Sequence, residues 1–323
     1  MSDADPPTLT DVTETPLPLS AVADLAERIE TNVADVIVGN EAVVGHIVTA
    51  LLARGHVLLE DVPGVGKTML ARSIARSVDC RFRRIQFTPD LLPTDVTGVN
   101  VFNEKSREFE FQPGPVFGNI VLGDEINRAP PKTQSALLEA MEERQVTADG
   151  DSHNLPDPFT VIATQNAVEP TRTYELPLAE FDRFMKKLEL GYPDPDAEAV
   201  LLGRAVGTHP IESLESVTDR ETLVRARETV ATIRVEKPVR SYITRLAGYT
   251  REHAEIGVSP RGSIALLRAA QARAGLDGRE YVIPDDVQTE APVVLPHRIR
   301  TTGREDAKTV VSDALERIAV EPS

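Results

Sequence analysis

The sequence predicts an α/β domain with a mostly parallel sheet, followed by a smaller domain made only of helices. Short strand-like runs alternate with helical patterns as far as residue 190, and a glycine-rich loop follows the first of these runs. Beyond residue 196 only helical patterns occur. Alternating strands and helices are typical of a parallel sheet covered on both faces, and a chain of 323 residues is long enough for two units.

The N-terminal part of the chain changes from an irregular to a helical pattern near Ser20. Residues 1–19 are rich in Pro, Thr and Asp without a period, so we expect them to be disordered. From Ser20, apolar residues recur at helical spacing as far as Val33. A second helix is then predicted, with Asn40 as its N-cap and Gly55 beyond its end.

Five short runs are predicted to be strands, with helical stretches between most of them. They are His56–Glu60, Phe82–Phe87, Asn119–Gly123, Phe159–Thr164 and Lys186–Leu190. The strand patterns stop at the proline-flanked segment 191–196. We therefore place the α/β domain at residues 20–192.

The remaining residues, 193–323, read as helices only. The predicted helices are Asp196–Ala205, Asp219–Ile233, Val239–Ala254, Gly262–Ala274, one opened by Pro284, and Glu305–Val320. Thr218 and Glu221 have the spacing of a capping box for the second of these helices. Together they form the predicted smaller, all-helical domain.

The composition excludes several classes of protein. The longest apolar stretches fall far short of the ~20 residues of a membrane-spanning helix, and the N-terminus is acidic, so we expect a soluble cytoplasmic protein with no membrane partner. The single cysteine, Cys80, excludes an intramolecular disulfide. The six histidines lack the spacing of a zinc site.

The net charge of −16 disfavours broad affinity for nucleic acid or for anionic lipid. Only 7 of the 35 basic residues are lysine. An acidic surface poor in lysine suits a cell interior of high salt, where self-repulsion is screened. The alternative is an ordinary acidic protein from a GC-rich genome.

The segment Asp61–Thr68 (DVPGVGKT) is the strongest candidate site. It lies between an apolar strand and a helical run, which is the order that a phosphate-binding loop requires. Lys67 would reach the terminal phosphates and the Thr68 hydroxyl would bind magnesium. The loop departs from the pattern G-x-x-x-x-G-K-[ST] because Asp61 replaces the first glycine, and an incidental glycine turn is the alternative. The expected nucleotide contacts are Pro63, Gly64, Val65, Gly66, Lys67, Thr68 and Met69.

Two adjacent carboxylates, Asp124 and Glu125, lie at the end of the third predicted strand. Ligands gather at the carboxyl ends of strands in such a sheet, so Asp124 could hold magnesium and Glu125 could orient and deprotonate the attacking water. A solvated turn is the alternative interpretation. The presence of the phosphate loop in the same chain favours the functional one.

Three segments resemble the MoxR branch of the AAA+ ATPases: Gly123–Val146, Gln86–Pro93 and Ala163–Asn166. The resemblance covers roughly residues 20 to 320. It implies an AAA+ P-loop domain followed by a helical lid domain, with ATP and Mg²⁺ as cofactors. An aspartate is frequent in this family at the position of Asp61.

The resemblance also implies roles for further residues. Asn166 would be the first sensor, which touches the γ-phosphate, and Arg183 the arginine finger, which acts on the nucleotide of the neighbouring subunit. Arg261 would be the second sensor, in the lid. Val38 and Gly39 match the stretch beside the adenine. Each residue also has a structural alternative. Asn166 could cap a turn, and Arg183 could form a surface pair with Asp182. Arg261 could be an exposed arginine of a first helical turn, and the apolar stretch at Val38 could belong to the core.

Two predicted hairpins bear on the partner. Asn100–Phe111 resembles the insertion in helix two of this clade, and Gln145–Leu155 resembles the hairpin before the first sensor. The second tip carries Asp149, Asp151 and His153, which would repel phosphates. This favours a protein client over nucleic acid.

The resemblance therefore predicts a ring-forming ATPase, expected to be a hexamer, in which lid motion remodels a bound protein. It further implies a chaperone-like role in maturing complexes or inserting cofactors or metals, with a von Willebrand factor A-domain partner. Two alternatives remain open at this point. One is a nucleic-acid motor, and the other is a nucleotide-gated assembly module without sustained turnover.

Overall fold

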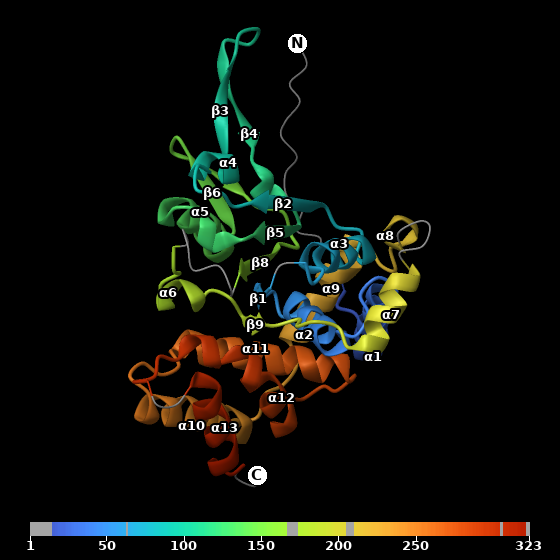
Figure 1. The fold of residues 1–323 in the computed structure, drawn as a ribbon, viewed down its shortest axis with the longest axis vertical. Coiled ribbons are helices and arrows are strands. Elements are labelled where there is room, and N and C mark those ends of the chain that lie inside the picture. The colour runs from blue at the N-terminus through green and yellow to red at the C-terminus, as the bar shows by residue number, and fades with distance from the viewer. Residues whose placement is uncertain (1–14, 63, 167–173, 205–209, 304–305, 321–323) are drawn as a thin grey trace.

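The computed structural model describes residues 15–62, 64–166, 174–204, 210–303 and 306–320 (Figure 1). Most of the N-terminal segment that was predicted to be disordered therefore lies outside the described residues. The first helix, α1, begins at Leu19, one residue before the predicted start.

A five-stranded parallel sheet forms the centre of the first domain, in the order β2-β5-β8-β1-β9. The strands are β1 (Val57–Asp61), β2 (Phe82–Gln86), β5 (Ile120–Asp124), β8 (Thr160–Asn166) and β9 (Lys186–Leu188). All five predicted strands are confirmed to within two residues at each end. The first strand in sequence lies near the middle of the sheet, as in other doubly wound sheets.

Helices cover both faces of the sheet, because alternate side chains of each strand point to opposite sides. Leu59 and Ile162 face the cluster that includes α1 (Leu19–Ala34), α2 (Glu41–Leu52) and α3 (Lys67–Ser77). Leu58 and Val161 face a second cluster, which contains α5 (Pro131–Glu143). The inner strands β1, β5 and β8 are therefore apolar on both sides, which explains why they read as nearly continuous apolar runs, whereas the edge strands β2 and β9 carry charged side chains.

Beyond the sheet the described chain is helical, as predicted. These helices are α7 (Pro195–Arg204), α8 (Pro210–Ser213), α9 (Arg220–Ala231), α10 (Lys237–His253), α11 (Pro260–Leu276), α12 (Pro284–Val294) and α13 (Ala307–Arg317). Two short helices, α4 (Pro93–Thr97) and α6 (Leu178–Phe181), lie between strands of the sheet domain. None of the described helices is long and apolar enough to cross a membrane.

One predicted helix cap is wrong, and a second occupies the predicted position without a capping hydrogen bond. The N-cap of α9 is Asp219, whose carboxylate accepts a hydrogen bond of 2.8 Å from the backbone N–H of Thr222, and not Thr218. Asn40 precedes α2 as predicted, but its side chain makes no capping hydrogen bond. Its backbone has φ −134° and ψ 32°, outside the extended geometry from which a cap side chain reaches the first turn.

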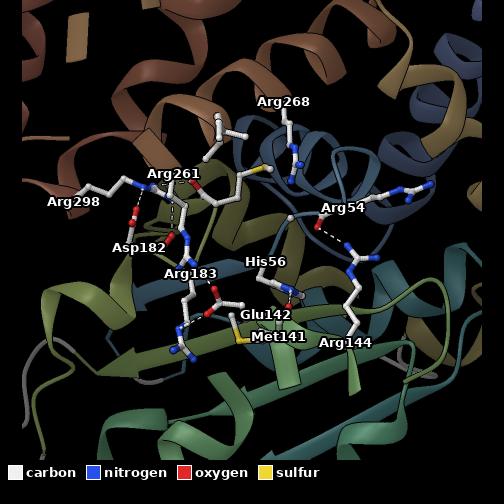
Figure 2. Close-up of a pocket in the computed structure, with 14 residues that line it drawn as sticks. Arg54, His56, Met141, Glu142, Arg144, Asp182, Arg183, Arg261, Arg268 and Arg298 are labelled. Atoms are coloured by element: carbon white, nitrogen blue, oxygen red, sulfur yellow. Dashed lines mark hydrogen bonds and ion pairs between the residues drawn. The ribbon is translucent and has the colours of Figure 1, made fainter. Parts of the chain in front are cut away.

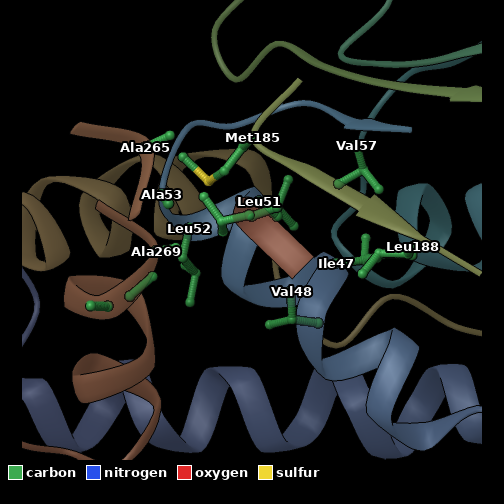
Figure 3. Close-up of a cluster of buried hydrophobic side chains, with 14 of the residues drawn as sticks. Ile47, Val48, Leu51, Leu52, Ala53, Val57, Met185, Leu188, Ala265 and Ala269 are labelled. Carbon is green, nitrogen blue, oxygen red and sulfur yellow. The ribbon is translucent and has the colours of Figure 1, made fainter. Parts of the chain in front are cut away.

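The helical domain packs against α1 and α2 through α11, and against β9 through α12. Figure 3 shows Leu51 and Leu52 of α2, Met185 and Leu188 beside them, and Ala265 of α11 in one buried cluster. The small alanines of α11 allow that helix to approach the sheet domain closely. This contact fixes the helical domain near the amino ends of the central strands.

A buried ionic cluster reinforces the same contact. The ammonium of Lys186 on β9 lies 2.5 Å from a carboxylate oxygen of Glu290 on α12, and both side chains are fully buried. The other oxygen of Glu290 lies 2.9 Å from Nη2 of Arg273 and 3.5 Å from Nδ1 of His46. Charges from α2, β9, α11 and α12 thus meet at one point.

Two hairpins leave the sheet domain, as predicted. They are β3–β4 (Gly98–Asn103 and Glu108–Pro113) and β6–β7 (Gln145–Ala148 and Asp151–Asn154), and β3–β4 projects far from the body (Figure 1). Nδ2 of Asn100 donates to Asp149 at 2.8 Å, and the rings of Phe111 and His153 stack 3.8 Å apart. The two hairpins therefore support each other.

Candidate functional site

The phosphate-loop candidate lies between the end of β1 and the start of α3, with Lys67 as the first helical residue. Gly64 and Gly66 have φ of +87° and +97°, a conformation that glycine adopts at little cost. A Cβ built on either glycine would meet no atom within 4 Å, so the loop has open space beside it. Pro63 lies outside the described residues. A glycine loop that opens onto a helix N-terminus is suited to bind phosphate.

The register of the sheet brings the other candidates to the same edge. Asp61 pairs with Asn166, and Gln86 pairs with Asp124. Since all these strands are parallel, their carboxyl ends meet beside Lys67. The structure thus places the predicted phosphate and magnesium residues together with Asn166, the predicted first sensor.

Asn166 has a feature expected of a side chain that faces a ligand. It is only 6% exposed, and its Oδ1 makes no hydrogen bond to any described residue. A buried polar atom without a partner is unusual in a folded protein. A side-chain amide here can donate to or accept from a bound group once one is present.

Both carboxylate oxygens of Asp124 have protein partners. Oδ1 accepts a hydrogen bond of 2.7 Å from the Thr164 hydroxyl. Oδ2 accepts from Arg84 of β2, at 2.6 Å from Nη2 and 3.1 Å from Nε. Asp124 is 8% exposed, so its charge is compensated inside the site.

Glu125 is held beside Asp124 in an uncommon backbone conformation, with φ 58° and ψ 51°. Its N–H donates to the Thr164 hydroxyl at 2.8 Å. Its Oε2 accepts from Nε2 of Gln86 at 2.9 Å and from Nη1 of Arg128 at 2.8 Å. A strained residue held by several hydrogen bonds is typical of functional sites.

The oxygen donors at this edge fit magnesium. The hydroxyl of Thr68 and the carboxylate of Asp124 are hard ligands, which Mg²⁺ prefers, and it completes its shell with water and substrate phosphates. Within the described residues, no group of three or more His, Cys, Asp or Glu side chains could hold a metal by itself. This arrangement suits an ion that arrives with a nucleotide.

Arg183 and Arg261 lie at the opposite edge of the sheet. Both line a cavity of about 260 Å³ that also includes Gly55, which precedes β1 (Figure 2). The phosphate loop follows the other end of this five-residue strand, roughly 16 Å away at about 3.3 Å per residue. Neither arginine can therefore contact the nucleotide held by Lys67 of its own chain.

The two arginines share a carboxylate in this cavity. Nε of Arg183 lies 3.2 Å from Oε2 of Glu142, and Nη2 of Arg261 contacts the other oxygen of Glu142 (Figure 2). All three side chains are partly exposed. Glu142 was not predicted, because its position in the last turn of α5 carries no local signal.

A second carboxylate supports the segments that carry both arginines. Oδ1 of Asp182 accepts a hydrogen bond of 2.7 Å from Nε of Arg298, and Oδ2 accepts one of 2.8 Å from the Ser259 hydroxyl. Arg298 is 3% exposed and also donates to the carbonyl of Phe184 at 2.6 Å. Burial lowers its pKa to about 10, although Asp182 opposes this shift. Arg298 remains charged at neutral pH.

Val38 and Gly39, predicted to lie beside the adenine, are in the connection between α1 and α2. Gly39 has φ +77°, and a Cβ there would lie 2.9 Å from Cβ of Ala197 on α7. The contact explains the glycine by packing alone. Their role in adenine binding stays a prediction.

Comparisons with known proteins agree on one kind of molecule. Residues 56–186 match the ATPase family associated with various cellular activities (AAA), and residues 246–318 match the AAA lid domain. The chain is 52% identical to the uncharacterized protein YeaC of Bacillus subtilis over 284 residues, 87% of this chain and 89% of YeaC.

Two further relatives cover most of the chain. It is 41% identical to the chaperone MoxR1 of Mycobacterium tuberculosis over 295 residues, 88% of this chain and 78% of MoxR1. A crystal structure of a proposed ATPase from Cytophaga hutchinsonii superposes with a TM-score of 0.88 at 33% identity, covering 94% of this chain and 97% of the other.

Proposed function

The chain belongs to the MoxR family of AAA+ ATPases, and from this membership and the geometry of its site we propose that it hydrolyses ATP at sites shared between the subunits of a ring. One observation carries the proposal. Lys67, Asp124 and Glu125 lie at one edge of the sheet, whereas Arg183 lies at the other. A site that contains all of them therefore requires two copies of the chain.

The residues at the carboxyl edge have the properties needed for binding and hydrolysis. The loop and Lys67 would hold the phosphates of ATP, and Asn166 would contact the γ-phosphate. Mg²⁺, when bound to Thr68 and Asp124, would neutralise phosphate charge. Glu125 would orient the attacking water and accept its proton as the water oxygen bonds to the γ-phosphorus. The bond from that phosphorus to the bridging oxygen then breaks, giving ADP and phosphate.

Arg183 and Arg261 would act on the nucleotide of the neighbouring subunit. An arginine supplied to a transferring γ-phosphate stabilises the developing charge and is worth about 10³–10⁵ in rate. In a subunit without a neighbour, Glu142 balances the charge of both. Docking of a neighbour would exchange this carboxylate for phosphate oxygens.

The hairpins favour a protein client. Phe102 and Phe109 are 49% and 71% exposed on β3–β4, while the adjacent tip carries Asp149 and Asp151. Exposed apolar side chains suit an unfolded or partly folded polypeptide, and the acidic side chains beside them would repel the phosphates of a nucleic acid. We further propose a hexameric ring in which lid motion remodels this client. The same proposal includes a von Willebrand factor A-domain protein as the partner and the insertion of cofactors or metals as the task. It also includes a cytoplasmic location and adaptation to high salt.

ATP hydrolysis with Mg²⁺ in molar KCl, measured over a range of protein concentrations, tests the shared site. Specific activity should rise as subunits associate and should collapse in Glu125→Gln and Arg183→Ala. Arg240→Ala, at an exposed arginine of α10, is the matched control and should leave activity unchanged.

Three results would redirect the proposal. Full activity of Arg183→Ala would contradict the shared site. ATP binding without turnover at every protein concentration would favour a nucleotide-gated assembly module. Stimulation by single-stranded DNA, and none by reduced, carboxymethylated α-lactalbumin as an unfolded protein, would favour a nucleic-acid motor.

A further inference from the structure

The candidate magnesium ligand Asp124 is already paired with the positively charged side chain of Arg84. The guanidinium of Arg84 lies on Oδ2 of Asp124 with two contacts, 2.6 Å and 3.1 Å, and the two charges form an ion pair. The Asp124 side chain is 12% exposed and that of Arg84 is 47% exposed. The carboxylate is thus fixed inside the site, while the arginine reaches it from the solvent side.

No oxygen of Asp124 remains without a partner. Oδ1 accepts the hydrogen bond from Thr164, which also accepts one from the N–H of Glu125. The Thr164 contact belongs to the buried strand β8 and cannot move without disturbing the sheet. Arg84 is exposed enough to leave, so Oδ2 is the oxygen that can become free.

We propose that Arg84 is the resident counter-ion of the magnesium site: it neutralises Asp124 when no nucleotide is bound and leaves that carboxylate when Mg²⁺ binds with the nucleotide. This inference rests on the proposed function. Two cations compete for one carboxylate, so the ion pair raises the Mg²⁺ concentration that nucleotide binding requires. It also keeps the empty site from holding an unpaired buried charge, which is costly.

The proposal makes a prediction of unusual sign, because removing an arginine should strengthen a binding event. In Arg84→Gln, the free Mg²⁺ concentration for half-maximal binding of nucleotide should fall roughly 3- to 10-fold, the range expected for losing a partly exposed, charge-assisted pair. Without Mg²⁺, nucleotide should bind more weakly to Arg84→Gln than to the wild type, because the bare Asp124 charge then faces the phosphates.

The measurement is the dissociation constant of a fluorescent ADP analogue, mant-ADP, as a function of free Mg²⁺, which needs no turnover. Arg83→Gln is the matched control: it removes the same charge from the neighbouring, exposed position of β2, whose side chain points to the other side of the strand. This control should keep the wild-type Mg²⁺ requirement. Arg84→Lys retains the positive charge and should therefore restore most of the wild-type Mg²⁺ requirement.

The outcomes separate this inference from the proposed function. If the wild type binds mant-ADP more tightly with Mg²⁺ but Arg84→Gln needs as much Mg²⁺ or more, the counter-ion role is overturned and the ATP site stands. If the wild type binds no nucleotide at any Mg²⁺ concentration, the proposed function fails as well. Should Arg84→Gln not fold, Arg84→Met keeps the aliphatic stem and carries the same expected shift. An equal shift in Arg83→Gln would reduce the effect to general charge and overturn the proposal.

Discussion

Arg298 and Asp182 are 116 residues apart in the sequence, yet Nε of Arg298 donates to the Asp182 carboxylate at 2.7 Å. This bond joins the helical domain to the segment that carries Arg183. The second oxygen of Asp182 is bound by Ser259, two residues before Arg261. One carboxylate therefore sets the relative position of two arginines that come from different domains.

Replacing Arg298 should thus slow hydrolysis and leave the binding of ATP nearly unchanged. We expect Arg298→Met to lower kcat by about 10²-fold, the cost of misplacing a catalytic group by roughly 1 Å, while KM for ATP changes little. Steady-state kinetics separate the two constants. Arg300→Met, at an exposed arginine nearby, should behave as the wild type.

The same variant could fail by misfolding, because Arg298 is buried. Ser259→Ala removes only one bond to Asp182 and should show the same separation of kcat from KM to a smaller degree. A raised KM with unchanged kcat in either variant would mean that the network supports the bound nucleotide of its own chain and not the arginines.

Mixing two inactive variants tests whether the catalytic residues come from different subunits. Lys67→Ala should destroy the proposed phosphate site and Arg183→Ala should remove the proposed arginine finger, but a mixed ring would contain interfaces with both residues intact. An equal random mixture should recover up to roughly a quarter of the wild-type rate, since a head-to-tail ring pairs each face with the opposite face of the next copy. No recovery in rings that demonstrably contain both variants would show that each subunit needs both of its own residues.

The residues that follow directly on strands were predictable from the sequence. Lys67, Asp124 and Asn166 each lie at or just after the end of an apolar run, and parallel strands bring such ends to one edge. The three inner strands were recognisable for a related reason. β1, β5 and β8 are largely buried on both faces, so their apolar runs are nearly unbroken, whereas the edge strands β2 and β9 carry charged side chains.

The partners of those residues were not predictable in the same way. Arg84 and Gln86 alternate along β2, and that spacing places them on one face, but only the pairing of β2 with β5 shows that they reach Asp124 and Glu125. Glu142 and Arg298 act across more than 40 and 110 residues of sequence, respectively. The wrong cap at Thr218 has a local cause, because the choice between adjacent residues depends on backbone angles that a sequence pattern does not contain.

Two buried histidines predict how stability depends on pH. Burial lowers the pKa of His56 to about 3, and burial together with Arg298 holds the pKa of His297 well below its usual value. Both are therefore neutral in the folded state near pH 6, whereas the unfolded chain takes up protons near 6.5. The contribution of these two neutral rings to the stability of the fold is therefore fully present above about pH 6.5 and is lost as the pH falls below that value.

At one pH unit below 6.5, each histidine should cost about 1.4 kcal/mol of unfolding free energy. Urea unfolding between pH 7 and 5.5 measures this slope. In His56→Gln, the number of protons taken up on unfolding near pH 5.5 should fall by about one, because Gln cannot titrate. A slope of zero in the wild type over this range would contradict the neutral, buried state of both rings.

The ionic cluster at the domain contact predicts an asymmetry between two single substitutions. Among the described residues, Glu290 is the one carboxylate within 4 Å of the Lys186 ammonium, and both side chains are fully buried. Glu290→Met should therefore cost about 3–5 kcal/mol of unfolding free energy, since it leaves a buried ammonium without a counter-charge. Glu290 itself has Arg273 and His46 as further partners, so Lys186→Met should cost less.

Urea unfolding of the two single variants and of Lys186→Met/Glu290→Met completes the test. The double variant should be more stable than Glu290→Met alone, because replacing both charges removes the unpaired ammonium that the single substitution leaves behind. Equal costs for the two singles, with additive behaviour in the double, would mean that solvent reaches the pair.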